Sequence, residues 1–188
     1  MTQQTPAHQS SMQPSDEATK KGLQFAREQG QAYQQALDYM TTQVAHGSKK
    51  PAGEYIVGYA VEEAEGLYHF KDGHLEWEEP GDTNAHVEVA VCDAADGRFI
   101  PALTVYVTLI ESNGKEVSTH QQPFLWHPTL YHYGRDWQVP GDGEYTLRIR
   151  IEPPTFPRHD KTNGKRYTRP VEVEFSRVEI KTGRKVSK

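Results

Sequence analysis

The sequence has one cysteine, no long apolar run and no excess of basic residues. The single cysteine, Cys92, excludes an intrachain disulfide framework and a zinc site built from several thiolates. No apolar stretch approaches the roughly 20 residues that a membrane-spanning helix needs. The formal net charge of -5 argues against a nucleic-acid-binding protein, which usually carries a basic face.

The sequence also lacks the motifs of several large enzyme classes. Neither GxGxxG, nor a P-loop, nor GxSxG occurs, and there is no internal repeat. We therefore expect a binding protein rather than an enzyme. The first residues show neither the basic nor the apolar region of a signal peptide. The chain as it stands is thus expected in the cytoplasm, unless it is a mature form whose signal has been removed.

The N-terminal part predicts three successive segments. Residues 1–14 are rich in Gln, Ser, Thr and Pro and predict a disordered tail. Residues 15–46 predict an amphipathic helical extension that begins at Ser15 and lies over the main domain or in a dimer contact. Gly30 is a potential weak point of this helix, and residues 47–54 are typical of a linker. The apolar residues of the helix recur at steps of three and four: Leu23, Ala26, Tyr33, Ala36, Leu37, Met40 and Val44.

Residues 55–181 predict an antiparallel β-sandwich, so the fold class is all-β with an N-terminal α-helical extension. Apolar and polar residues alternate in segments such as HVEVAVCD, LTVYVTLIE and EYTLRIRIE. Asp-Gly and Asn-Gly turns separate these segments, as in a sandwich of about seven or eight strands. The alternation slips near Ser176 and Arg177, which predicts a β-bulge. Residues 182–188 are expected to be a basic tail.

Three histidines and a glutamate are the candidate site residues. His86 and Glu88 are two apart on a predicted strand and therefore share a face, which in a simple sandwich is exposed to solvent. His132 follows an aromatic loop, and His159 lies in a loop stiffened by prolines, EPPTFPRHD. Imidazole and carboxylate together are a common ligand set for first-row transition metals. Periodicity alone does not show that these residues meet.

Aromatic residues in and after the segment FLWHPTLYHYG suggest a different function. Trp126, Tyr131 and Trp137 would suit stacking on a sugar ring, as in a non-catalytic carbohydrate- or protein-binding module. The sequence favours a packed corner at one end of the sandwich, because sandwich domains commonly fill their ends with aromatic residues. The sequence leaves both interpretations open.

Five segments follow one another in a distinctive order and spacing: HVEVAV, DGRFIPALTVYVTL, QPFLWHPTLYHYG, GDGEYTLRIRIEPP and RHDKTNGKRY. In this order the chain resembles the periplasmic iron-transport accessory proteins, which are small copper- and iron-binding proteins that act with an iron permease. The resemblance runs from about Tyr55 to Ile180. It implies an immunoglobulin-like sandwich, a homodimer, a permease as partner, and a periplasmic location if the chain is a mature form.

The resemblance also implies a metal site. The strand histidine and nearby glutamate of the family correspond to His86 and Glu88. The histidine of HYG corresponds to His132, and the histidine after EPP corresponds to His159. Three imidazoles and one carboxylate suit iron or copper, and also zinc or manganese.

The chain departs from the family at the methionine ligand, whose position holds Leu125. A thioether is a soft ligand that favours Cu(I), whereas leucine does not bind metals. His127 lies two residues further on and is an additional candidate ligand.

Overall fold

The structure, a computed structural model of the chain, describes residues 11–185. Helix α1 (Lys20–Tyr39) continues into a π-helical turn, η1 (Met40–Val44). The strands are β1 (His46–Ala52), β2 (Tyr55–Glu62), β3 (Leu67–Lys71), β4 (His74–Glu78), β5 (Ala85–Asp93), β6 (Val105–Glu111), β7 (Glu116–Gln122), β8 (Phe124–Leu125), β9 (His132–Trp137), β10 (Gly143–Ile151) and β11 (Val171–Ile180).

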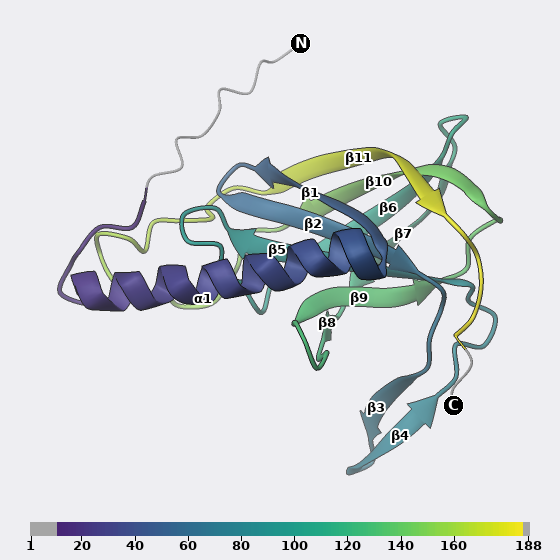
Figure 1. Cartoon of the computed structure of the whole chain (residues 1–188), viewed down its shortest axis with the longest axis horizontal. Helices are drawn as coiled ribbons and strands as arrows, with labels where there is room; N and C mark the ends of the chain where they lie inside the picture. Colours follow the sequence, from purple (N-terminus) through teal and green to yellow (C-terminus); the bar gives the residue numbers. More distant parts are fainter. Residues whose placement is uncertain (1–10, 186–188) are drawn as a thin grey trace.

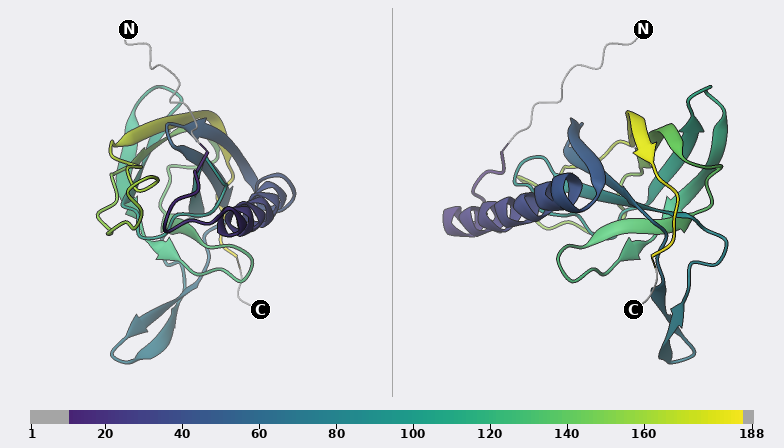
Figure 2. Two further views of the ribbon diagram at one scale, coloured as in Figure 1. Left: turned by 90° about the vertical axis from the view of Figure 1, so that its left-hand side faces the viewer. Right: turned by 45° about the vertical axis from the view of Figure 1, so that its right-hand side comes forward.

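Most of the strands form a sandwich of two antiparallel sheets (Figure 1). One sheet has five strands in the order β1-β2-β5-β9-β8, and the other has four in the order β11-β10-β6-β7. The remaining two, β3 and β4, pair as a hairpin that projects away from the sandwich (Figures 1 and 2). The predicted antiparallel β-sandwich with an N-terminal helix is thus confirmed.

The alternating residues of the strands form the core between the two sheets. Val87, Val89 and Val91 of β5 belong to the same buried cluster as Leu147 and Ile149 of β10. This arrangement follows from the period of two in each strand, which sends alternate side chains to opposite faces.

The bulge expected in the last strand is present. Tyr145 of β10 pairs with Val178 of β11, while Leu147 pairs with Phe175, so β11 contains one extra residue between these pairs. Arg177 in this interval has a φ of 57°, in the left-handed region that a bulge can accommodate.

The C-terminal half of α1 and η1 cover the outer face of the five-stranded sheet, and the N-terminal half of the helix extends beyond the strands (Figures 1 and 2). Leu37 and Met40 form a second apolar cluster with Ala90, Cys92 and Leu130. Ala90 and Cys92 are on the face of β5 opposite to the valines of the main core. Both faces of this strand are therefore covered, and all its residues are buried.

Gly30 allows the helix to approach the sandwich closely rather than weakening it. A β-carbon at this position would lie 1.7 Å from the carbonyl oxygen of Asp96. Only glycine fits there without displacing the helix or the turn that contains Asp96.

The prediction of a linker over residues 47–54 is wrong, because strand β1 occupies most of this range. β1 pairs with β2 along its whole length, from His46 opposite Val61 to Ala52 opposite Tyr55. Glycine, serine, lysine and proline suggested a linker, but β1 is an edge strand, where Pro51 is tolerated because only one side of the strand is paired.

The helix also begins later than expected. Thr19 is its N-cap and accepts a hydrogen bond from Gly22 N through its side chain, at 3.0 Å. Ser15, the expected cap, instead donates to Asp160 Oδ2 at 2.7 Å. Both residues carry a suitable hydroxyl, and the contact between the chain start and the loop containing Asp160 decides between them.

The two predicted tails are only partly described. Residues 1–10 of the expected tail 1–14 lie outside the described residues, but Gln13 is hydrogen-bonded to Asn163 through both its backbone N and O. Residues 186–188 of the expected basic tail also lie outside. Within the described part, Lys185 N donates to Ala64 O, and its side chain pairs with Glu65.

Candidate metal centre

His86 and Glu88 lie on the covered face of β5. His86 is 0% exposed and Glu88 is 5% exposed. The expectation that this face of β5 is exposed to solvent is therefore wrong, because other parts of the chain cover it. Glu88 shares a small cavity with Leu37 and Met40 of the helical segment. Glu65, between β2 and β3, places its Oε1 3.9 Å from His86 Nε2.

His132 is the third member of the cluster. It begins β9, next to β5 in the sheet, and is 4% exposed. Its Nε2 lies 3.3 Å from Glu88 Oε1, and His86 Nε2 lies 4.0 Å from the same oxygen. Each of the three residues offers one ligand atom, and these atoms lie within 4.8 Å of one another. One ion would fit between them.

The other ring nitrogen of each histidine is engaged by an acceptor. His86 Nδ1 donates to Asp136 Oδ1 at 2.8 Å, and His132 Nδ1 donates to Leu130 O at 3.3 Å. In the neutral form of each ring, these bonds hold the proton on Nδ1 and leave the lone pair on Nε2. Among the described residues, neither Nε2 has a hydrogen-bond partner, which is unusual for a buried polar atom. A histidine held by a carboxylate at Nδ1 is the usual arrangement around a bound metal.

Burial sets the protonation of the cluster. It raises the pKa of Glu88 to about 7 and lowers the pKa of His132 to about 4. For His86, burial alone lowers the pKa, but the hydrogen bond to Asp136 and the carboxylates of Glu65 and Glu88 outweigh it and raise the pKa. His132 is therefore a neutral imidazole at neutral pH, the form that binds metals.

Gly134 keeps the space between the ligand atoms open. A β-carbon at this position would lie 3.1 Å from His86 Nε2, 3.1 Å from Leu125 Cδ1 and 3.2 Å from His132 Cδ2. Leu125, opposite His132 in the β8–β9 pair, thus borders the cluster with a methyl group. The position of the family's methionine ligand is therefore next to the site but offers no donor atom.

The other two candidate histidines are not part of this cluster. The ring of His127 lies 5.8 Å from that of His132, but its Nδ1 interacts with Thr129 Oγ1 at 3.0 Å. His159 is exposed and lines a different pocket, together with Asp93 and Arg98. Within one chain, the described residues bring together His86, Glu88 and His132 only.

Asp136 and Glu65 were not identified from the sequence. The spacing along β9 could have identified Asp136. His132, Gly134 and Asp136 are two residues apart in turn and therefore share one face of the strand. No such spacing marks Glu65, because it lies between strands in a run of acidic residues. It is held there by its backbone N, which donates to Asp136 Oδ1 at 3.2 Å, and by Lys185 Nζ, 2.8 Å from its Oε2.

The three aromatic residues do not form a common platform. Trp137 is buried in the core between the sheets, with its ring against His120. Trp126 and Tyr131 are exposed, and Tyr131 stacks on Phe124. The platform interpretation fails because Trp137 ends β9 on its inward face, opposite to the face of His132 and Asp136.

A family model described as Fe²⁺ transport protein matches residues 48–180. The chain belongs to this family. The match covers both sheets except the first two residues of β1, includes every residue of the cluster, and begins after α1 and η1. In the described part of the chain, no helix combines the length and the apolar character required to cross a membrane.

Solved structures share the fold. FetP from a uropathogenic Escherichia coli strain is 20% identical with a TM-score of 0.60, and the match covers 72% of this chain and 94% of that one. A copper-bound variant of Campylobacter jejuni P19 is 17% identical with a TM-score of 0.61, covering 76% of this chain and 99% of that one. No curated protein sequence matches the chain.

Proposed function

We propose that this protein binds a transition metal ion through His86, Glu88 and His132 and delivers it within an iron-transport system. The observation that carries the proposal is the pair of buried Nε2 atoms that lack a hydrogen-bond partner and face one buried carboxylate. Burying three ionisable groups together is costly unless they interact with each other or with an ion. Membership of the Fe²⁺ transport family supports the transport role.

Iron and copper are the proposed ions. Two imidazoles and a carboxylate suit Fe(II), Fe(III) and Cu(II), and Zn(II) and Mn(II) are compatible with the same set. Structures of both FetP and P19 are described as copper-bound. We propose binding and transfer rather than catalysis, with the ion as cargo.

A homodimer and an iron permease are the proposed partners. Three ligands from one chain leave at least one coordination position open. His159 is exposed on a loop, so it is accessible to a second copy of the chain and is our candidate for a ligand donated across a dimer interface. If so, His159→Ala weakens metal binding and dimerisation together, as measured by calorimetry and analytical ultracentrifugation. A variant that is unchanged in both would remove His159 from the site.

We further propose that the protein acts outside the cytoplasm. FetP was produced in the periplasm for its structure, and the family resemblance is to periplasmic proteins. The expectation of a cytoplasmic protein rested only on the composition of the first residues and has no support from the comparisons.

The decisive test is titration calorimetry of metal-free protein with Cu(II), Zn(II), Mn(II) and, without oxygen, Fe(II). Wild type should bind about one ion per chain, and His132→Ala should bind at least about 100-fold more weakly, because a direct ligand matters at least as much as the groups that support it. His69→Ala is the matched control, since His69 is exposed on the projecting hairpin. Binding that is indifferent to His132 would refute the proposal.

A further inference from the structure

The helical segment contributes one side chain with a metal-binding atom to the surroundings of the cluster. Met40, the first residue of η1, is 7% exposed. It lines a cavity of about 10 Å³ whose walls also include Glu88 and His132. Because the family match begins at residue 48, Met40 lies in a part of the chain that the family model does not describe.

The cavity has the size of a small ion, and Glu88 and His132 of the cluster line it, whereas His86 does not. Its volume is close to the minimum that holds one water molecule. Apart from Glu88 and His132, its side chains are those of Leu37, Tyr59, Ala60, Ala90, Leu130 and Met40. The Met40 thioether is therefore the one soft donor among the side chains lining the cavity.

The local backbone fixes where Met40 sits. Thr41 is buried, and its Oγ1 donates to Leu37 O at 2.9 Å, while Ala45 N donates to Met40 O at 2.9 Å and closes the π-helical turn. π-Helical turns are rare and occur often at functional sites. The methionine side chain has three rotatable bonds, so its sulfur can adjust to an ion without moving this backbone.

We propose that Met40 is a metal ligand, adding a thioether from the helical segment to Glu88 and His132 at the cavity that the three residues share. The inference rests on the proposed metal site and adds selectivity to it. A thioether raises affinity for Cu(I) and does little for Zn(II), which prefers imidazole, carboxylate or thiolate. With Leu125 at the family's methionine position, the soft ligand thus comes from a different part of the fold.

The simpler role of Met40 is to fill a gap in the apolar cluster under the helix. Met40→Leu separates the two roles, because leucine has nearly the same volume and keeps the packing but has no donor atom. Met12→Leu is the matched control: Met12 lines the separate pocket that contains His159.

The test is a competition titration of the full chain with Cu(I) against a Cu(I)-specific chelator, without oxygen, and a parallel titration with Zn(II). Met40→Leu should lower Cu(I) affinity about tenfold or more and change Zn(II) affinity less than about threefold. Met12→Leu should match wild type for both ions. Equal Cu(I) affinity in wild type and Met40→Leu would overturn the proposal.

X-ray absorption of the Cu(I)-loaded wild type gives a direct readout that needs no variant to fold. A copper–sulfur shell should be present in wild type and in Cys92→Ala, which removes the other nearby sulfur, and should be lost in Met40→Leu. Absence of the shell in wild type, or its loss in Cys92→Ala, would overturn the role of Met40. Loss of all metal binding in His132→Ala with no effect of Met40→Leu would leave the three-residue site intact and reject only this ligand.

Discussion

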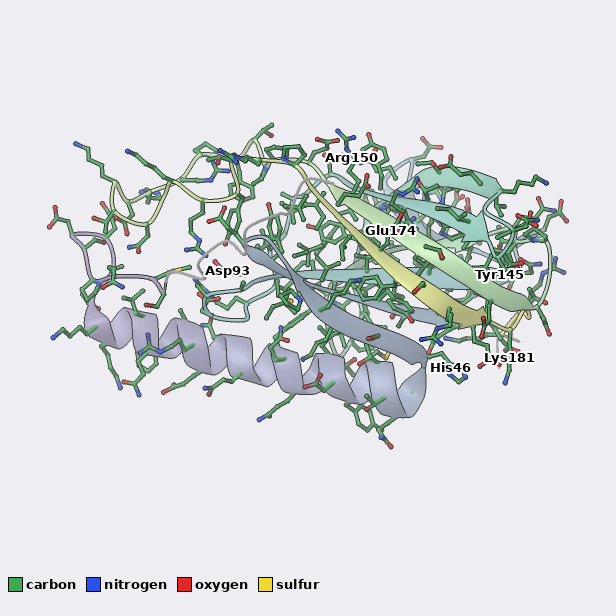
Figure 3. All side chains as sticks on the ribbon, turned by 90° about the horizontal axis from the view of Figure 1, so that it is seen from above. His46, Asp93, Tyr145, Arg150, Glu174 and Lys181 are labelled. Carbon is green, nitrogen blue, oxygen red and sulfur yellow. The ribbon has the colours of Figure 1, made fainter. Side chains whose placement is uncertain are left out.

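The two sheets of the sandwich have outer faces of opposite character. On the five-stranded sheet, α1 covers the face that carries His86 and Glu88, and all nine residues of β5 are buried. On the four-stranded sheet no helix or strand of residues 11–185 covers the outer face, and Arg150 of β10 and Glu174 of β11 lie on its surface (Figure 3). His86 and Glu88 alternate with apolar residues just as Arg148 and Arg150 do, so the alternation at these positions does not reveal which face meets solvent.

Burial gives the polar residues of the two faces different chemistry. Burial raises the pKa of Glu88 to about 7, and the Nε2 atoms of its neighbours His86 and His132 have no hydrogen-bond partner among the described residues. On the outer face of the four-stranded sheet, which we call the bare face, Arg148 instead forms exposed ion pairs with Glu174 and Glu116, at 2.7 and 2.9 Å. A covering helix thus converts a face that would carry solvated ion pairs into one that can hold an ion.

The largest expected effect concerns Cys92, the thiol beneath the helix. Burial raises its pKa to about 12. The folded thiol therefore stays protonated between about pH 7 and 9, where an unfolded thiol ionises, and its thiolate fraction is roughly a hundred- to a thousandfold lower. Alkylation at about pH 8 should be slower in native than in denatured protein by at least this factor. Equal rates would mean that α1 does not cover β5 in solution.

Leu37→Ala should have the largest effect on stability among simple changes at the covered face. Leu37 is buried between α1 and the sheet, beside Gly58 of β2. Truncation should lower the free energy of unfolding by about 2–5 kcal/mol and speed alkylation of Cys92. Chemical denaturation measures the first effect. Phe25→Ala, at an exposed position of the same helix, is the control and should cost less than about 1 kcal/mol. Similar losses in both would contradict tight docking of the helix.

Gly30→Ala and Gly22→Ala test whether the helix is held by close approach or by helix propensity. At Gly30 the added methyl would overlap the Asp96 carbonyl, so we expect a loss of about 1–3 kcal/mol. At Gly22 the nearest atom is Thr19 Oγ1 at 3.3 Å, so alanine should be neutral or stabilising by up to about 1 kcal/mol. Thermal unfolding compares the two. A gain in stability at both positions would contradict the close contact at Gly30.

Local patterns were sufficient for the sandwich. Strict alternation and the Asp-Gly and Asn-Gly turns predicted the antiparallel sheets, and the slip at Ser176 and Arg177 predicted the bulge. These features depend on neighbouring residues, so sequence periodicity carries them. Edge strand β1 was missed because its composition resembles a linker and its pairing with β2 is what stabilises it.

The candidate site depended on contacts that no local pattern encodes. The shared face of His86 and Glu88 follows from their spacing, but their burial follows from α1, whose docking joins residues about 50 positions apart. His132 was a candidate from its place after the aromatic loop, but only the family resemblance joined it to His86 and Glu88 in one site. Met40 was identified only as part of an apolar stripe, because helical periodicity does not distinguish a packing thioether from one beside a carboxylate and an imidazole.

The smallest effect should come from the bare face. Arg148→Ala removes the ion pairs with Glu174 and Glu116 but leaves both carboxylates in water, so the loss should be at most about 1 kcal/mol. Raising the salt concentration to about 1 M should make this loss of stability smaller still, because salt screens exposed charges. A double-mutant cycle with Glu174→Ala measures the pair itself. A coupling above about 2 kcal/mol, insensitive to salt, would show that this face is desolvated too, and the contrast between the two sheets would fail.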